Sequence, residues 1–249
     1  MGTLLDDGKY QVLENLFSEA GYAASICIDV ETRNNFKPLI FNIYSEPDHI
    51  SRFLPLFYGV SPGMCDSFRR LIPGSRCIMA VFDYHQGVPL IDHLKSLPKK
   101  DYPERAQIVG RLLDATLVLD MLPPIFAISA LKQPNTVINR KENTIHLNFI
   151  IKPRTEPTND EKIQAFIEYL ENALVKNRYL PELAADFLKK ASSGEITGFV
   201  QICAAWRSIS AAAMEEYESY LKESIFKYLK RLMKKKAIEK REKVKEARG

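Results

Sequence analysis

The apolar residues of this sequence change their spacing along the chain, and the change limits the folds that the chain can adopt. Residues 9–16, 25–30 and 38–44 have the short apolar or alternating patterns of β-strands, and residues 76–84 form a fourth such run. After residue 100 the apolar residues recur every three or four positions, as on one face of an α-helix. The sequence therefore predicts an α+β fold, with a small antiparallel sheet followed by a mainly helical part.

Punctuating residues indicate where the helices begin and end. A helix starting at Pro47 is expected to be short or broken, because Pro55 interrupts it. A long helix is predicted from Asp101 until Pro123 stops it. Residues 158–161 read Thr-Asn-Asp-Glu, a capping box that predicts the start of another helix.

Residues 128–150 predict a β-hairpin with a loop at each end. A polar turn, 132–135, leads into strand-like residues 136–138. The connection 139–143 is followed by a run with strand-like alternation that returns to residue 150.

This hairpin resembles the catalytic segment of eukaryotic-type protein kinases. The family pattern is His-Arg-Asp-Leu, three free positions and Asn, and it falls on residues 128–135. Leu131, Lys132 and Asn135 match it, and the family's Asp-Phe-Gly falls on residues 148–150. The order of predicted elements also resembles the family: three strands, a helix, a strand, a long helix and the hairpin.

The resemblance implies a bilobal protein-kinase-like fold with a reduced helical lobe. Its small lobe and hinge would be residues 1–94, and a truncated large lobe would be residues 95–205. Residues 206–249 would then be a helical basic extension.

The residues that carry kinase chemistry are replaced. Ala130 stands at the catalytic-base Asp, Asn148 at the metal-binding Asp, and Asn42 at the phosphate-binding Lys. The turn over residues 17–22, which would be Gly-rich in a kinase, contains bulky and acidic residues. The resemblance therefore implies a pseudokinase with no catalytic residues, and we expect the chain not to be an enzyme.

A residual nucleotide pocket would consist of Lys132, Asn135, Asn148 and Asn42, whose family counterparts lie beside the phosphates and a metal ion. The alternative is that Lys132 is a solvated loop residue and that Asn135 fixes the backbone of a turn. We favour this alternative and expect no cofactor. The four histidines and four cysteines show no metal-ligand spacing, so no metal site is predicted either.

Positive charge is concentrated at the end of the chain. Residues 227–249 contain eleven Lys and Arg and three Glu, a net charge of +8, whereas the whole chain carries +4; the remainder therefore carries −4. This segment could be a solvated helix or a surface for anionic membrane lipid. Nucleic acid is not an expected partner, because aromatic residues for base stacking end at Tyr228.

We expect no signal peptide, because the first residues lead straight into polar ones, and no membrane span, because no apolar run reaches the necessary length. We expect a cytoplasmic protein, peripheral to or anchored at the inner membrane face through residues 227–249. The predicted function is a catalytically inactive interaction or scaffold module that binds a protein partner and belongs to a membrane-associated assembly. Two alternatives remain: a nucleotide-binding sensor or weak atypical kinase, and a basic tail that binds anionic lipid or nucleic acid.

Overall fold

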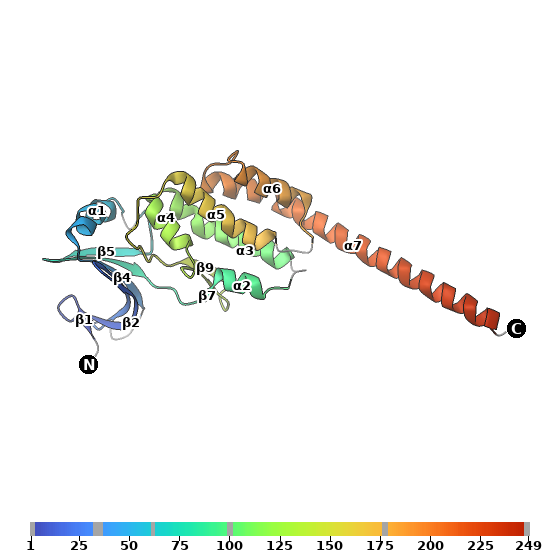
Figure 1. Cartoon of the computed structure of the whole chain (residues 1–249), viewed down its shortest axis with the longest axis horizontal. Coiled ribbons are helices and arrows are strands. Elements are labelled where there is room, and N and C mark those ends of the chain that lie inside the picture. The colour runs from blue at the N-terminus through green and yellow to red at the C-terminus, as the bar shows by residue number, and fades with distance from the viewer. Residues whose placement is uncertain (1–2, 32–36, 61–62, 99–101, 176–178, 247–249) are drawn as a thin grey trace.

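The protein has an α+β architecture in which a curled antiparallel sheet and one helix lie at one end and the other helices lie at the opposite end (Figure 1). The computed structural model describes residues 3–31, 37–60, 63–98, 102–175 and 179–246, and beyond residue 223 only some side chains. The prediction of a mixed fold with a small antiparallel sheet is confirmed.

Six strands form the main sheet in the order β1-β2-β3-β4-β6-β5, with every neighbouring pair antiparallel. Their bounds are β1 Leu4–Leu5, β2 Tyr10–Glu19, β3 Tyr22–Asp29, β4 Leu39–Tyr44, β5 Phe68–Pro73 and β6 Ile78–Asp83. Strands β2 and β3 extend almost to each other, so the turn expected over residues 17–22 is reduced to Ala20 and Gly21. Gly21 has φ +72, and a Cβ there would lie 2.3 Å from the Glu46 side chain, so this position requires glycine.

Both faces of the main sheet are covered. Ile40 and Phe82 belong to the large core that continues into the helices. Phe41, Val81 and Tyr10 belong to a second, smaller apolar cluster. Adjacent strand residues point to opposite faces, so the nearly continuous apolar runs of β4 and β6 supply both clusters.

Helix α1, Pro47–Tyr58, corrects the expectation of a short or broken helix. Pro55 lies inside its last turn, where its carbonyl accepts a hydrogen bond of 3.0 Å from Gly59 N. The twelve-residue helix persists because Phe53 and Phe57 are buried against the sheet, and Phe53 stacks on Tyr44 with ring centroids 4.5 Å apart. Aromatic packing thus outweighs the backbone hydrogen bond that proline cannot donate.

The remaining elements form the helical part and a small second sheet of order β7-β8-β9. Their bounds are β7 Val88–Pro89, α2 Leu90–Ser96, α3 Tyr102–Thr116, the 3-10 helix η1 Leu117–Asp120, α4 Pro124–Leu131, β8 Thr136–Asn139, β9 Thr144–Leu147, α5 Asn159–Leu174, α6 Glu182–Ser192 and α7 Phe199–Glu246. The predicted long helix ends earlier than expected, at Thr116, and Pro124 begins a new helix because proline suits the first helical turn. The hairpin of β8 and β9 and the capping box at Thr158 are confirmed.

Helix α7 belongs to the body in its first part and leaves it in its second. Trp206, Ala213 and Tyr217 are buried, and Phe187 of α6 packs on Trp206 with ring centroids 5.2 Å apart. The boundary predicted between residues 205 and 206 therefore falls within a packed stretch of helix. Past Tyr220 the helix extends away from the body (Figure 1).

A carboxylate of α7 fixes this helix to the start of α6, near the point where α7 leaves the body. Glu216 accepts hydrogen bonds from Tyr179 Oη at 3.0 Å and from the backbone N–H of Glu182 at 2.7 Å, so it caps the first turn of α6. Within the described residues, no helix is both long enough and apolar enough to cross a lipid bilayer.

Candidate functional site

The residues aligned with the kinase catalytic motif lie at the end of helix α4 and not in an exposed loop. Every residue from Ile125 to Leu131 is buried, and Ala130 has no exposed surface. Ser129 and Ala130 therefore offer their backbone carbonyls, not side chains, to the turn that follows.

Asn135 and Thr136 use those carbonyls to fix the turn before β8. Its Nδ2 donates to Ser129 O at 2.7 Å, and its backbone N–H donates to Lys132 O at 2.7 Å. Thr136 Oγ1 donates to Ala130 O at 2.9 Å. Asn135 is 6% exposed, so its amide serves the backbone of this turn.

Asn148 joins the end of the hairpin to His85, which lies two residues after β6. Its Oδ1 accepts from His85 N at 2.9 Å and its Nδ2 donates to His85 O at 3.0 Å, as a neighbouring strand would. Its own N–H donates to Asn135 O at 2.8 Å. Two of the predicted pocket residues are therefore adjacent, and both side-chain amides are occupied by backbone groups.

Asn42 lies fully buried in β4 and binds the segment that leaves the hairpin. Its Nδ2 donates to Phe149 O at 2.9 Å, and its Oδ1 accepts from Ile151 N at 2.7 Å and from Tyr22 Oη at 3.0 Å. Tyr44 Oη donates to Ile151 O at 2.6 Å. Burial raises the pKa of both tyrosines, and nearby Glu19 raises that of Tyr22 further, so the phenols remain protonated donors.

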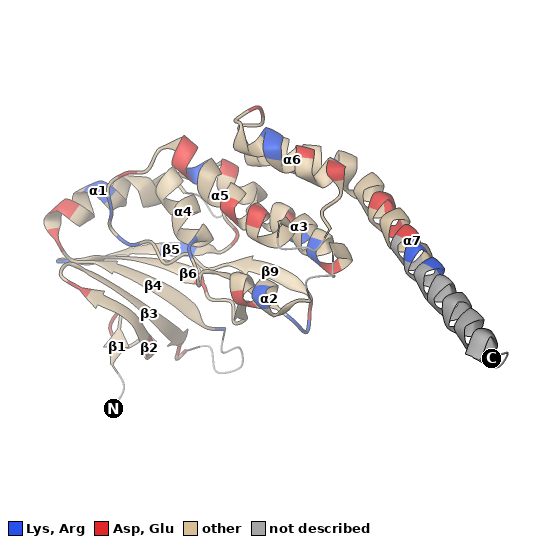
Figure 2. Ribbon diagram, turned by 45° about the vertical axis from the view of Figure 1, so that its right-hand side comes forward, with Lys and Arg blue, Asp and Glu red and all other residues tan. Residues whose placement is uncertain are grey.

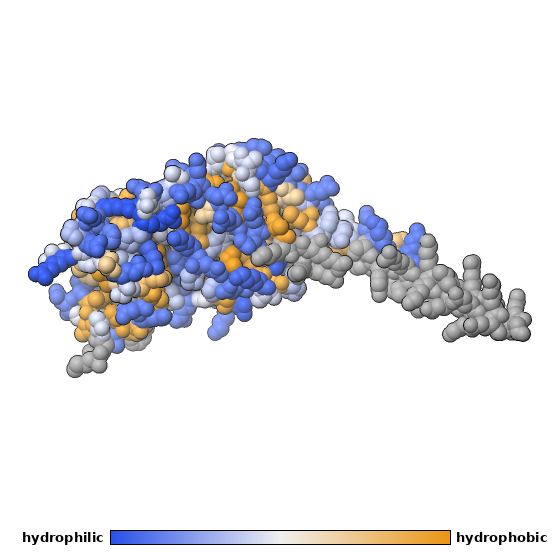
Figure 3. All heavy atoms as spheres, in the orientation of Figure 1, coloured by the Kyte–Doolittle hydropathy of each residue, from blue (hydrophilic) through white to orange (hydrophobic). Residues whose placement is uncertain are grey.

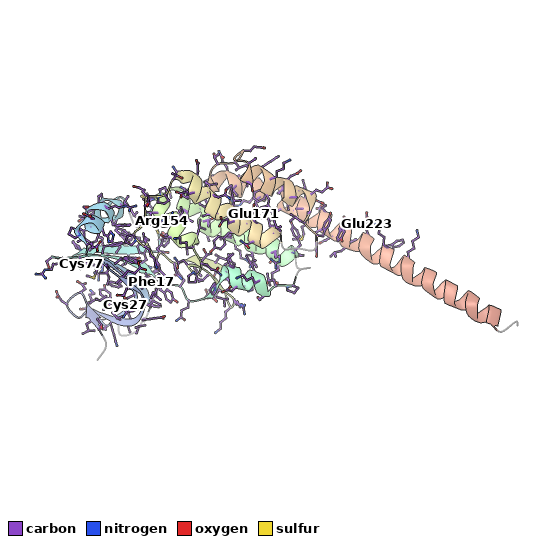
Figure 4. The ribbon with its side chains drawn as sticks, in the orientation of Figure 1. Phe17, Cys27, Cys77, Arg154, Glu171 and Glu223 are labelled. Atoms are coloured by element: carbon purple, nitrogen blue, oxygen red, sulfur yellow. The ribbon has the colours of Figure 1, made fainter. Side chains whose placement is uncertain are left out.

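Residues 148–154, here called the crossing segment, run over one face of the main sheet. Phe149 stacks on Phe82 with ring centroids 5.2 Å apart. Lys152 Nζ lies 3.2 Å from the centroid of the Phe17 ring and 3.4 Å from Glu19 Oε1. Figure 4 labels Phe17 on the sheet and Arg154 near the helices.

The far end of the crossing segment is tied to two helices. Arg52 of α1 donates from Nη1 to Arg154 O, and Arg154 Nη2 lies 3.9 Å from Glu161 Oε1 in α5. The segment thus contacts β6, β4, β2, α1 and α5 within a few residues.

The surroundings of Lys132 differ from those of the three asparagines. Its side chain is exposed, and among the described residues no acceptor or acid lies within bonding distance of its ammonium group. It lines a cavity of about 340 Å³ together with Ile91, Leu131 and Tyr169. Partial burial, followed by the nearby charges of Arg154 and Lys152, lowers the pKa of Lys132.

A histidine pair beside Asn148 was not expected from the sequence. The rings of His85 and His146 stack with centroids 4.3 Å apart, and His146 Nε2 lies 2.9 Å from Thr144 Oγ1. Burial and then His146 lower the pKa of His85 to about 4, so its ring is neutral near pH 7. Across the part of the chain that the structure describes, no three His, Cys, Asp or Glu side chains gather as metal ligands would.

The chemistry of the site is therefore that of a backbone clamp. Three asparagine amides hold the hairpin, His85 and the crossing segment together. Sequence reasoning identified these asparagines through the kinase resemblance as a residual ligand pocket, and it favoured the alternative that Asn135 fixes the backbone of a turn. The sequence matches no protein-family model, and a search of curated proteins finds no match.

Proposed function

We propose that this chain is a catalytically inactive pseudokinase that acts as an interaction or scaffold module. The order of elements supports the kinase-like origin: strands β1 to β4, helix α1, strands β5 and β6, the connection to the helical part, the long helix α3 and the hairpin of β8 and β9. We further propose that the sheet and the helical part correspond to the two lobes of that fold.

The contact between Asn42 and the crossing segment carries the proposal. The resemblance aligns Asn42 with the phosphate-binding Lys and Asn148 with the metal-binding Asp, two positions that a kinase brings together at the phosphates. Here Asn42 meets Phe149 and Ile151, which are 107 and 109 residues away in sequence. On this proposal, the chain keeps the meeting point of the two positions and lacks both charges.

The contacts around this point favour a structural role over phosphoryl transfer. Transfer needs a positioned base, a metal ligand and charges that stabilise the phosphates. Ala130 is fully buried and has no ionisable group, and the amides of Asn42 and Asn148 are bonded to backbone. Lys152, which could supply positive charge, is engaged by Phe17 and Glu19.

A thermal-shift titration with ATP and Mg²⁺ tests the proposal, with Lys132→Ala as the test variant. Lys95→Ala is the matched control, because Lys95 is an exposed lysine that forms an ion pair with Asp92, with 3.3 Å between Lys95 Nζ and Asp92 Oδ1. We expect no saturable rise in Tm for any of the three proteins and no transfer of phosphate to peptide. A saturable rise that is lost in Lys132→Ala and kept in Lys95→Ala would instead support a nucleotide sensor.

One observation favours that sensor as a second candidate. The Lys132 ammonium group has no bonding partner among the described residues and faces a cavity, so it could bind an anionic ligand. The proposed location is the cytoplasm, with residues 227–249 at the inner face of the membrane as a further proposal from their net charge of +8.

A further inference from the structure

The cavity that Lys132 lines is surrounded by α2, α4 and α5 and has a volume of about 340 Å³; it is here called the Lys132 cavity. Its interior is mainly apolar, because Ile128 and Leu131 of α4 and Tyr169 of α5 line it and are at most 6% exposed. Lys132 and Glu168 also line it, and both are exposed. The cavity therefore has an apolar interior and two opposite charges at its mouth.

Lys132 is a lining cation without a counter-ion. Partial burial, followed by the positive charges of Arg154 and Lys152, lowers its pKa, so two further cations lie close to it. Those two cations are paired with acids of their own. Lys152 Nζ lies 3.4 Å from Glu19 Oε1, and Arg154 Nη2 lies 3.9 Å from Glu161 Oε1. In the part of the chain that the structure describes, no acid lies within bonding distance of the Lys132 ammonium group. One negative charge is therefore missing at this point.

The two amides of the lining already have acceptors. Gln133 Nε2 donates to Asp92 Oδ1 at 3.2 Å, and Asn172 Nδ2 donates to Glu168 O at 2.8 Å. The Lys132 ammonium group is thus the lining donor that is left for an anionic ligand.

We propose that the Lys132 cavity binds a small organic monocarboxylate. The carboxylate of the ligand pairs with the Lys132 ammonium group, a charge-assisted contact. Its hydrocarbon part lies against Ile128, Leu131 and the ring of Tyr169, where it leaves water. One unpaired cation beside an apolar interior matches a ligand with one negative charge and an apolar body.

The surroundings of the cavity favour this ligand over more highly charged anions. Helix α5 carries Asp160, Glu161, Glu168 and Glu171, and Figure 2 shows several acidic bands along it. These charges repel a ligand that carries several negative charges, such as a nucleoside triphosphate. Inorganic phosphate would leave the apolar interior empty. The inference concerns the same lysine as the nucleotide sensor but a different ligand, and it does not depend on the proposed pseudokinase function.

Equilibrium dialysis of the full chain with radiolabelled octanoate, below the concentration at which octanoate forms micelles, tests the proposal. We expect saturable binding of one octanoate per chain. Acetate has the charge without the hydrocarbon part, and octan-1-ol has the hydrocarbon part without the charge. Each should compete with octanoate only at concentrations higher by about tenfold or more, because each loses one of the two contacts.

Substitutions of Lys132 test the charge. Lys132→Gln should weaken octanoate binding by about tenfold or more, whereas Lys132→Arg keeps the positive charge and should retain most of it. Lys132 is exposed, so neither change should alter the fold, and an unchanged Tm checks this. Lys95→Ala is again the matched control and should bind octanoate as the unaltered chain does, because Lys95 does not line the cavity.

A substitution of Ala165 tests the apolar interior without changing any charge. Ala165 of α5 is half-buried and lines the cavity, so Ala165→Leu should fill part of the cavity and abolish octanoate binding. Ala185→Leu is its control, because Ala185 is exposed on α6, away from the cavity, and this variant should bind normally.

Four results would overturn the proposal. These are no saturable octanoate binding, equal binding by Lys132→Gln, competition by octan-1-ol as strong as by octanoate itself, and unchanged binding by Ala165→Leu. A chain that bound ATP with Mg²⁺ through Lys132 and did not bind octanoate would overturn it as well and would support the nucleotide sensor instead.

Discussion

Replacing Asn42 with Ala is expected to lower the free energy of unfolding more than replacing any exposed asparagine with Ala would. The change leaves three buried groups without their partner: Phe149 O, Ile151 N and Tyr22 Oη. Each buried polar group left without a hydrogen bond costs about 1 to 3 kcal/mol. Some relaxation of the crossing segment should reduce the sum, so we expect a loss of about 4 kcal/mol in the free energy of unfolding.

Urea unfolding followed by circular dichroism measures this loss, provided that the dependence on urea is unchanged. Asn172→Ala is the matched control, because Asn172 donates to Glu168 O on an exposed side of α5 and should cost less than about 1 kcal/mol. Hydrogen exchange gives a local readout, because Asn42→Ala should speed the exchange of the Ile151 amide more than that of the core amides of α3. A loss below about 1 kcal/mol with unchanged Ile151 exchange would refute the clamp.

Two further predictions concern pH and the domain boundary. Well above pH 6.5 His85 is neutral in both states. As the pH falls toward 4, the unfolded chain binds a proton that the folded chain resists, because burial and then His146 hold the His85 pKa at about 4. With allowance for partial solvent screening, the free energy of unfolding at pH 5 should be lower by about 1 to 2 kcal/mol. In a pH series of urea titrations, His85→Gln should remove that part of the dependence of the free energy of unfolding on pH. An unchanged dependence would contradict the prediction. A chain ending at residue 205 lacks Trp206 and Tyr217 and should lose cooperative thermal unfolding, whereas one ending at residue 223 should keep it. A cooperative transition in the shorter chain would place the boundary where the sequence predicted it.

Local signals in the sequence predicted the local structure well. The capping box at Thr158 and the hairpin connection at residues 139–143 depend on residues a few positions apart, and both form as expected. Strand β5 at the sheet edge was missed, because Arg69 and Arg70 interrupt its apolar alternation. Helix α1 was underestimated, because Phe57 of this helix packs on the rings of Phe82 and Phe126, which come from later in the chain.

The candidate site depends on contacts that no local pattern encodes. Asn42 stands alone within the apolar run of β4, and the sequence gives no sign that it will meet Ile151 across 109 residues. His85 and His146 are likewise far apart in sequence and stack only because the hairpin packs beside the end of β6. The resemblance to kinases indicated which asparagines to consider, and the structure supplied their partners.

The exposed face in Figure 3 is hydrophilic over much of the helical part, with apolar patches between the polar side chains. The projecting part of α7 is a feature of a different kind, because its length amplifies any movement at the point where it leaves the body. From Tyr220 to Glu246 the helix spans about 39 Å, so a tilt of about 10° at its base would move its tip by about 7 Å. Glu216, bonded to Tyr179 Oη and to the backbone of Glu182, lies near that point. A force on the tip of α7 would therefore act first on the hydrogen bonds between Glu216 and the first turn of α6.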